Sequence, residues 1–162
     1  MRYLIFAAGL FLAIPAFSAA HAEKTETEHP EAKPYKKNAK ASKNVDAALA
    51  RAAVADKRVL LVMGANWCHD SRGLAGWFER PRFAAMLEPK YEIVYVDVGY
   101  RDRNIDIAQR FGIEEIKGTP TVLVLSPRGA LLNPESAPSW RNAASRDEED
   151  IFAYFDQFTP EL

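Results

Sequence analysis

The chain contains a single cysteine among its 162 residues. This residue, Cys68, lies in the stretch NWCHDS at positions 66–71. A thiolate is the nucleophile of disulfide exchange, and two cysteines separated by two residues perform this exchange by closing and opening their own disulfide. Here the second position of such a pair is occupied by Ser71. Any disulfide of Cys68 must therefore be formed with another molecule.

The neighbours of Cys68 indicate how its thiol could be activated. A cysteine at the first turn of a helix lies near unpaired backbone N–H groups and the positive end of the helix dipole, which favours the thiolate. We expect His69 and Arg72 to add positive charge and so to tune the thiol toward its thiolate form. The Ser71 hydroxyl, three residues on, should face Cys68 and could donate a hydrogen bond to it. Asp70 would act in the opposite direction by like-charge repulsion.

Two other kinds of site fit these residues poorly. Cys68, His69 and Asp70 are the residue types of a protease-like triad, but consecutive residues do not face one another on a helix. A metal site would need further ligands beside Cys68 and His69, and the other histidines, His21 and His29, precede the predicted domain. We therefore expect no metal and no other cofactor.

The first 22 residues predict export. Arg2 precedes an apolar run at residues 3–17, and the small-residue pattern Ala-His-Ala follows at 20–22. This arrangement is typical of a secretory signal peptide that is cleaved after Ala22. The run is shorter than the roughly 20 apolar residues that cross a bilayer, which favours a cleaved signal over a membrane anchor. We expect a periplasmic or secreted protein without stable membrane insertion.

Residues 23–43 are expected to form a disordered tether. They include six Lys, four Glu and two Pro and no aliphatic residue larger than Ala, so they cannot bury enough apolar surface to offset the entropy of ordering. The remaining residues, 44–162, suffice for one domain with a core. Without Arg2 the 21 basic residues fall to 20, against 22 acidic residues. This balance gives no indication of nucleic-acid binding.

The predicted domain alternates between helices and buried strands. Apolar periodicity behind a capping Asn44 predicts a first helix, and continuous apolar runs predict strands at 58–64 and 91–99. The helix that follows the cysteine motif should be interrupted near Pro81, because proline is favourable in a first helical turn. This order predicts an α/β fold with a mixed central sheet flanked by helices.

The last third of the chain completes this pattern. A short helix is expected near 104–112, and the Pro-Arg-Gly turn within 119–133 predicts a hairpin of two strands. Ser145 and Glu148 form a capping box that predicts the start of the last helix. Trp140, in the loop before that helix, is either a surface plug or a groove residue, and we favour the plug.

Four stretches, taken in order, make the domain similar to the thioredoxin superfamily. They are ANWCHDSR, FERPRFAAMLEPKYEIVYVDV, AQRFGIEEIKGTPTVLVLSPRG and the final amphipathic helix. The resemblance implies a thioredoxin-like fold with Cys68 as the nucleophile and Ser71 beside it in the catalytic motif. It also implies that Trp67, Thr119 and Pro120 bind the substrate, and that the peptide bond before Pro120 is cis.

The sequence departs from the family pattern at two positions. Ser71 stands where the second cysteine is usual. Val62 stands six residues before the nucleophile, where members often carry a buried acid that helps to deprotonate the second thiol. Because no second thiol is present, no such acid is needed, and the two departures are mutually consistent.

The resemblance implies a thiol–disulfide oxidoreductase that works through one thiol. Cys68 would attack a disulfide or an oxidised cysteine on a client protein, and an external thiol or redox partner would resolve the mixed disulfide. The alternative is a non-catalytic binding module that holds an extended or unfolded protein segment. A Cys68→Ala variant separates the two hypotheses, because binding survives this change only in a module.

Overall fold

The computed structural model describes residues 29–37 and 40–158. The expected signal peptide at 1–22 and the first part of the expected tether lie outside the described residues. The elements follow one another as α1 (Ala41–Ala55), β1 (Arg58–Gly64), α2 (His69–Glu79), α3 (Pro81–Leu87), β2 (Tyr91–Asp97), α4 (Ile105–Arg110), β3 (Thr121–Leu125), the 3-10 helix η1 (Ala137–Ser145) and α5 (Glu148–Asp156).

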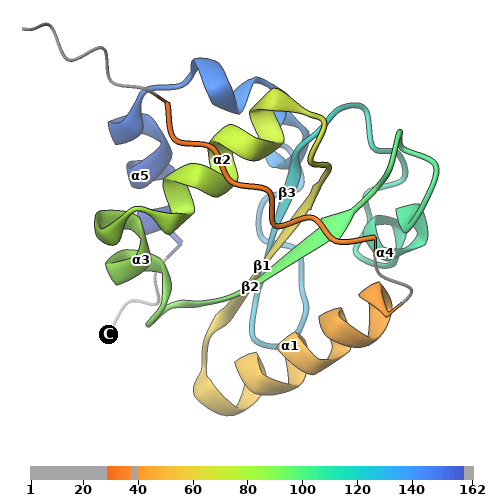
Figure 1. The fold of residues 1–162 in the computed structure, drawn as a ribbon. Coiled ribbons are helices and arrows are strands. Elements are labelled where there is room, and N and C mark those ends of the chain that lie inside the picture. The colour runs from red at the N-terminus through yellow and green to blue at the C-terminus, as the bar shows by residue number, and fades with distance from the viewer. Residues whose placement is uncertain (1–28, 38–39, 159–162) are drawn as a thin grey trace, which may run out of the picture.

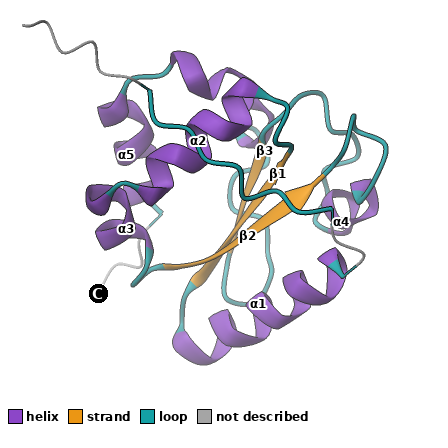
Figure 2. Cartoon of the chain, in the orientation of Figure 1, coloured by secondary structure: helices purple, strands orange, loops and turns teal. Residues whose placement is uncertain are grey.

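The three strands form the mixed sheet that the sequence predicts. Their order is β2-β1-β3, with β1 parallel to β2 and antiparallel to β3 (Figure 2). The parallel pair requires a crossover connection, which α2 and α3 provide. The interruption between these helices lies at Pro81, the first residue of α3, as predicted.

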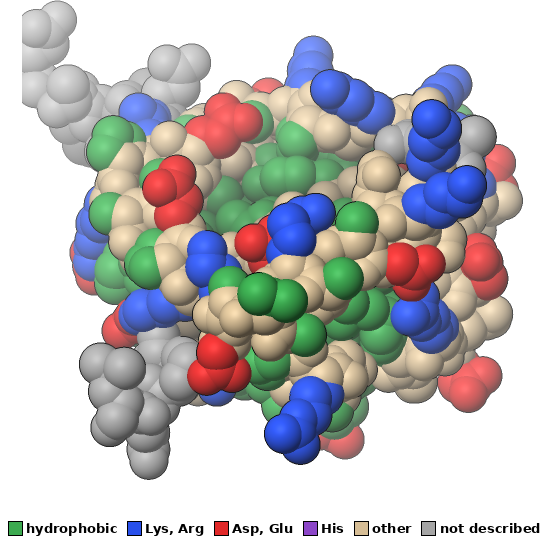
Figure 3. Space-filling view, turned by 90° about the horizontal axis from the view of Figure 1, so that it is seen from below, with side chains coloured by type: hydrophobic (Ala, Val, Ile, Leu, Met, Phe, Trp, Pro, Cys, Tyr) green, Lys and Arg blue, Asp and Glu red, His purple; other side chains and the backbone are tan. Residues whose placement is uncertain are grey.

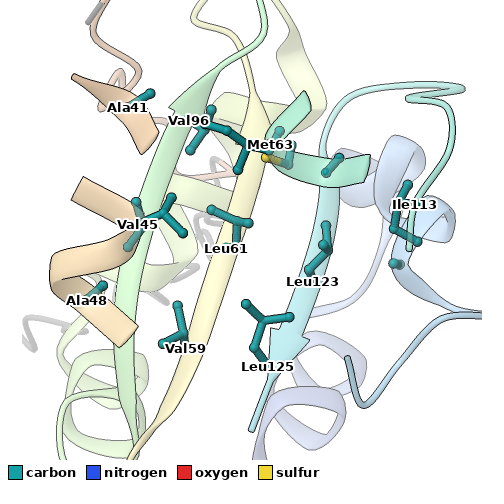
Figure 4. Packing of buried hydrophobic residues seen from close by; sticks show 14 of the residues in the cluster. Ala41, Val45, Ala48, Val59, Leu61, Met63, Val96, Ile113, Leu123 and Leu125 are labelled. Carbon is teal, nitrogen blue, oxygen red and sulfur yellow. The ribbon is translucent and has the colours of Figure 1, made fainter. Parts of the chain in front are cut away.

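Helices cover both faces of the sheet (Figure 1). One core cluster joins α1 and α4 to one face of the sheet, and the other joins α2, α3, η1 and α5 to the opposite face. Figure 4 shows the first cluster, in which Val45 of α1 packs toward Leu61 of β1 and Val96 of β2. Central strand β1 is buried on both faces, which explains its uninterrupted apolar run.

The second strand of the expected hairpin is not formed. Beyond β3, the chain makes an isolated bridge between Leu125 and Leu131. The side chain of Asn133 then replaces a backbone partner: its Oδ1 accepts from the Val124 N–H (2.8 Å), and its Nδ2 donates to the Val122 carbonyl (2.9 Å). The side chain of Asn133 therefore provides hydrogen-bond partners for backbone groups of β3, and the sheet gains no fourth strand at this edge.

Two predicted helix starts are also wrong. Helix α1 begins at Ala41 rather than behind Asn44, and Ala41 is part of the core. Helix α5 begins at Glu148 with Asp147 at its N-cap. The expected capping box is absent, because the Ser145 hydroxyl donates to the Asn142 carbonyl at the end of η1 (2.9 Å).

Trp140 belongs to the core and is not a surface plug. Its side chain is fully buried in η1 and lies stacked on Phe155 of α5, with ring centroids 4.7 Å apart. The loop before the last helix is therefore a helical segment that covers the end of the second core cluster.

The prediction of a disordered tether is wrong for residues 29–37, which are packed against the domain. Residues 29–37, which we call the N-terminal strap, cross α2 in Figure 1 (orange). Tyr35 is only 3% exposed and packs in the second core cluster. Its backbone N–H donates to Asn66 Oδ1 (3.1 Å), and its carbonyl accepts from Asn66 Nδ2 (2.7 Å). Burial of Tyr35, the hydrogen bonds to Asn66 and the ion pairs of Glu31 with α2 together hold this segment.

The surface of the described residues mixes charges of both signs. Figure 3 shows lysine and arginine side chains interspersed with aspartate and glutamate on one face. No helix among residues 29–37 and 40–158 is long and apolar enough to cross a membrane.

Candidate active site

Cys68 lies at the junction between the loop after β1 and the first turn of α2. It is the N-cap residue of α2, and its backbone is extended, with φ −81° and ψ 123°. Its side chain makes no capping hydrogen bond. The thiol instead donates to the carbonyl oxygen of Thr119, 3.1 Å from the sulfur. The Thr119–Pro120 peptide bond is cis. The hydrogen bond joins two residues that are 51 positions apart in the chain.

The sulfur lies between the start of α2 and the loop that contains Pro120. The first turn of α2 begins at the next residue, and the Thr119 carbonyl is the hydrogen-bond acceptor of the thiol. Cys68 is 9% exposed and Thr119 is 6% exposed. The sulfur and its hydrogen-bond acceptor are therefore both largely covered by the surrounding residues.

Ser71 is placed differently from the sequence expectation. It is fully buried, and its Oγ accepts a hydrogen bond from the Ala65 N–H (3.4 Å), whereas no hydrogen bond joins it to Cys68 within the described chain. The Tyr35 hydroxyl donates to the Ser71 backbone carbonyl (3.4 Å). Burial raises the pKa of Tyr35 well above its usual value, so the phenol stays protonated and remains a donor. Ser71 and Tyr35 together fill the space beneath the first turn of α2.

Gly64 shows how closely these groups pack. A Cβ at this position would lie 2.6 Å from the Tyr35 hydroxyl and 2.7 Å from Ser71 Oγ. The last residue of β1 must therefore be glycine for both hydroxyls to be accommodated. Val62, the position where the family resemblance led us to look for a buried acid, is fully buried in the same core cluster as Tyr35.

Arg72 and His69 are both bound to Glu31 of the strap. Glu31 Oε2 accepts from Arg72 Nε (3.0 Å), and Oε1 lies 3.2 Å from Arg72 Nη2 and 2.7 Å from His69 Nδ1. Hydrogen bonds from Arg72, and then from His69, hold the pKa of Glu31 below its usual value. The same carboxylate raises the pKa of Arg72. The charges expected to act on the thiol are thus balanced by an acid that the sequence did not single out.

Arg72 also secures the loop before the nucleophile. Its Nη1 donates to the carbonyl oxygens of Asn66 (3.1 Å) and Trp67 (3.0 Å). Asp70 is turned away, because its Oδ1 accepts from the Ala144 N–H of η1 (2.8 Å). Arg72 is therefore placed to hold the turn as well as to supply charge.

Trp67 lies on the surface beside the thiol. It is 50% exposed, and its indole N–H donates to the Gly99 carbonyl (2.9 Å). Its ring is stacked on Tyr100, with centroids 5.2 Å apart and an interplanar angle of 17°. Tyr100 is 74% exposed. These two rings, the aromatic platform, form an exposed apolar surface that includes the residue before Cys68.

Of the residues that the sequence singled out, Cys68 and Thr119 are joined by a hydrogen bond beside the cis peptide of Pro120, and Trp67 lies on the surface. The side chains of His69, Asp70, Ser71 and Arg72 are bonded to other residues. Sequence reasoning missed Glu31, Tyr35 and Tyr100. A groove of about 770 Å³ lies along the strap and α2 and includes Glu31, His69 and Gly76, but not Cys68. Only the presence of glutamate and tyrosine within a lysine-rich segment could have drawn attention to the strap.

Comparisons with known proteins agree with this geometry. The family model described as Thioredoxin-like matches residues 40–127. A crystal structure of a disulphide isomerase from Xylella fastidiosa Temecula1 superposes with a TM-score of 0.71 at 31% sequence identity, covering 78% of this chain and 96% of that one. The chain belongs to the thioredoxin-like family. Both the superfamily and the fold predicted from the sequence are confirmed.

A more distant similarity is to a Pseudomonas aeruginosa protein of unknown function. It has 20% identity and a TM-score of 0.39, over 74% of this chain and 86% of that one. No curated protein sequence matches this chain significantly.

Proposed function

We propose that this protein is an exported thiol–disulfide oxidoreductase that acts through a single thiol. The observation that carries the proposal is the position of Cys68, at the start of α2 and hydrogen-bonded to Thr119 beside the cis peptide. Membership of the thioredoxin-like family and the similarity to a protein described as a disulphide isomerase support the same class of chemistry.

The proposed reaction has two exchange steps. The Cys68 thiolate attacks one sulfur of a client disulfide, and the other client sulfur leaves as a thiolate. An external thiolate, such as that of a small thiol or a partner protein, then attacks the client sulfur of the mixed disulfide and releases Cys68 as a thiolate. The external thiol is required because residue 71 is a serine, whose hydroxyl is not a nucleophile toward sulfur.

Trp67 and Tyr100 support a protein client. An exposed, stacked aromatic pair beside a thiol provides apolar contact area for a polypeptide. The Thr119 backbone is in hydrogen-bond contact with the sulfur and could pair with an extended client segment.

Trapping of covalent adducts tests the proposal. Cells that produce the wild type or Cys68→Ala would be quenched in acid, and their proteins would be separated on non-reducing gels. The wild type should give adducts that a reducing agent removes, and Cys68→Ala should give none. An absence of adducts from wild type whose Cys68 is alkylated at a normal rate would contradict the redox function.

A binding module is the second candidate. It is favoured by the contrast between the exposed aromatic platform and the buried sulfur, since Trp67 is 50% exposed and Cys68 only 9%. In this case Cys68→Ala would still capture an unfolded client protein, without any covalent adduct. Loss of capture in Cys68→Ala would contradict the module.

Export rests on residues 1–22 alone. We expect the mature protein to begin at Glu23 and to be found in the periplasm or the medium. The intact mass of protein recovered from these fractions tests the cleavage position, and a cytoplasmic protein that retains residues 1–22 would overturn it.

A further inference from the structure

Glu31 occupies a fixed position beside the thiol site. The strap N–H of Ala32 donates to the Arg72 carbonyl of α2 (3.1 Å), one residue from the carboxylate. Pro30 passes so close to Gly76 that a Cβ there would lie 2.5 Å from the Glu31 nitrogen. These contacts fix the strap on both sides of Glu31. Its carboxylate is therefore held toward α2 by the backbone, in contrast to an ordinary surface acid.

The carboxylate meets the two basic side chains nearest to Cys68 in sequence. Arg72 binds Glu31 through Nε and Nη2 and uses its remaining Nη1 for the carbonyls of Asn66 and Trp67. One planar guanidinium thus joins the strap to the two peptide units that precede the nucleophile. His69, the residue after Cys68, contacts the same carboxylate.

The other charged groups at this place have different orientations or partners. Asp70 of α2 accepts from the Ala144 N–H. Glu79 at the end of α2, Arg80 between α2 and α3, and His29 of the strap line the same groove as Glu31. Tyr35 is buried and protonated. Among the described residues, Glu31 is the carboxylate paired with Arg72 and His69.

We propose that Glu31 is a positioning residue of the thiol site that also limits the reactivity of Cys68. It orients Arg72 against the turn before Cys68, and its negative charge offsets the positive charge that would otherwise stabilise the thiolate. This inference deepens the proposed function and rests on it for its biological meaning. The N-terminal strap is then part of the active site, where the sequence predicted only a tether.

The test is the rate of Cys68 alkylation by iodoacetamide as a function of pH in the purified mature chain. Glu31→Gln keeps the size of the side chain and removes its charge. From the Coulomb energy of one charge in a partly solvated site, the midpoint of the profile should move about half a pH unit lower. Glu31→Asp, which keeps the charge, should retain the wild-type midpoint more closely than Glu31→Gln.

Glu79→Gln is the matched control. It removes the same charge from the same groove, but Glu79 is not bonded to Arg72 or His69 within the described chain. The proposal requires a clear shift in Glu31→Gln and a much smaller one in Glu79→Gln. Equal shifts, or no shift in a folded Glu31→Gln protein, would overturn it.

A merely structural role gives a different result. If Glu31 only holds the strap over the site, Glu31→Gln would raise the maximal alkylation rate and leave the midpoint unchanged, and this result would also overturn the proposal. Arg72→Gln provides a second variant with the opposite expected shift, to higher pH. The profile needs no client, so an absence of adducts in cells would contradict the proposed function without affecting this measurement.

Discussion

Gly76 of α2 and Pro30 of the strap are in direct backbone contact, with no space for a side chain between them. A Cβ at Gly76 would lie 2.5 Å from the Glu31 nitrogen and closer still to the Pro30 carbonyl group. At Gly73, one turn earlier, a Cβ would have ordinary contacts at 3.6 Å with Ala144. The two glycines of one helix therefore have different environments, and only Gly76 is required by the strap.

This difference predicts opposite effects of two alanine substitutions. Alanine is favoured over glycine in a helix by about 1 kcal/mol, so Gly73→Ala should leave stability unchanged or raise it. Gly76→Ala should lower it by about 1–3 kcal/mol, because the strap backbone must move. Urea unfolding measures the change in the free energy of unfolding for both variants. In a chain that lacks residues 23–37, Gly76→Ala should instead be stabilising, and a persistent loss there would show that the strap is not the cause.

The ion pairs of Glu31 predict a pH-dependent contribution to stability. The folded state holds the pKa of Glu31 below the ordinary value of 4.5. The contribution should therefore be fully present above about pH 4.5 and be lost as the pH falls through the lower folded value. The urea midpoints of the wild type and Glu31→Gln should differ at pH 7, and the difference should narrow as the pH falls below 4.5.

Glu114, an exposed acid outside the strap, provides the control. Glu114→Gln should change the urea midpoint little at either end of this pH range. A difference between the wild type and Glu31→Gln that persists unchanged at pH 3 would mean that the carboxylate charge does not hold the strap.

The aromatic platform predicts a separation of client binding from thiol chemistry. Tyr100→Ala removes a ring that is 74% exposed and should reduce the yield of client adducts several-fold, since an aromatic contact contributes about 1 kcal/mol. The alkylation rate of Cys68 should stay near the wild-type value. Val54→Ala, at a 90% exposed apolar position on α1, is the control and should alter neither. Equal adduct yields in all three proteins would exclude Tyr100 from client contact.

The sequence is most informative where one physical signal dominates. The apolar run of β1 and the proline that opens α3 act locally, and both were predicted correctly. Tyr35 was missed because the average composition of a lysine-rich segment conceals one aromatic side chain. Its burial depends on Gly64 and Asn66, which lie about 30 residues further along the chain.

The same reasoning explains the misplaced elements near the C-terminus. Trp140 lies among serine and proline residues, and only its partner Phe155 reveals that it belongs to the core. The second strand of the hairpin is missing where the side chain of Asn133 takes the hydrogen bonds to β3 that the backbone of a neighbouring strand would make. At the thiol, residue types identified Arg72 and His69, but their orientation toward Glu31 is a tertiary contact that no local pattern encodes.

The last prediction concerns the missing second thiol. Ser71 is fully buried beneath the first turn of α2, and its hydroxyl accepts from Ala65 without a bond to Cys68. Ser71→Cys places a nucleophilic sulfur three residues from Cys68. In a mixed disulfide this sulfur can attack Cys68, release the client as a thiolate and close an internal disulfide. Adducts of Ser71→Cys should therefore decay faster than those of the wild type when no external thiol is added.

Ser71→Ala is the matched control, because it also removes the hydroxyl but supplies no thiol. Its adducts should last as long as those of the wild type until a small thiol is added. Non-reducing gels after acid quenching give the adduct lifetimes, and intact mass shows the loss of two hydrogens when the internal disulfide closes. The larger sulfur must fit between Tyr35 and Gly64, so the reduced variant should be less stable by about 1 kcal/mol. If Ser71→Cys folds and its adducts persist like those of Ser71→Ala, then the serine does not set the lifetime of the mixed disulfide.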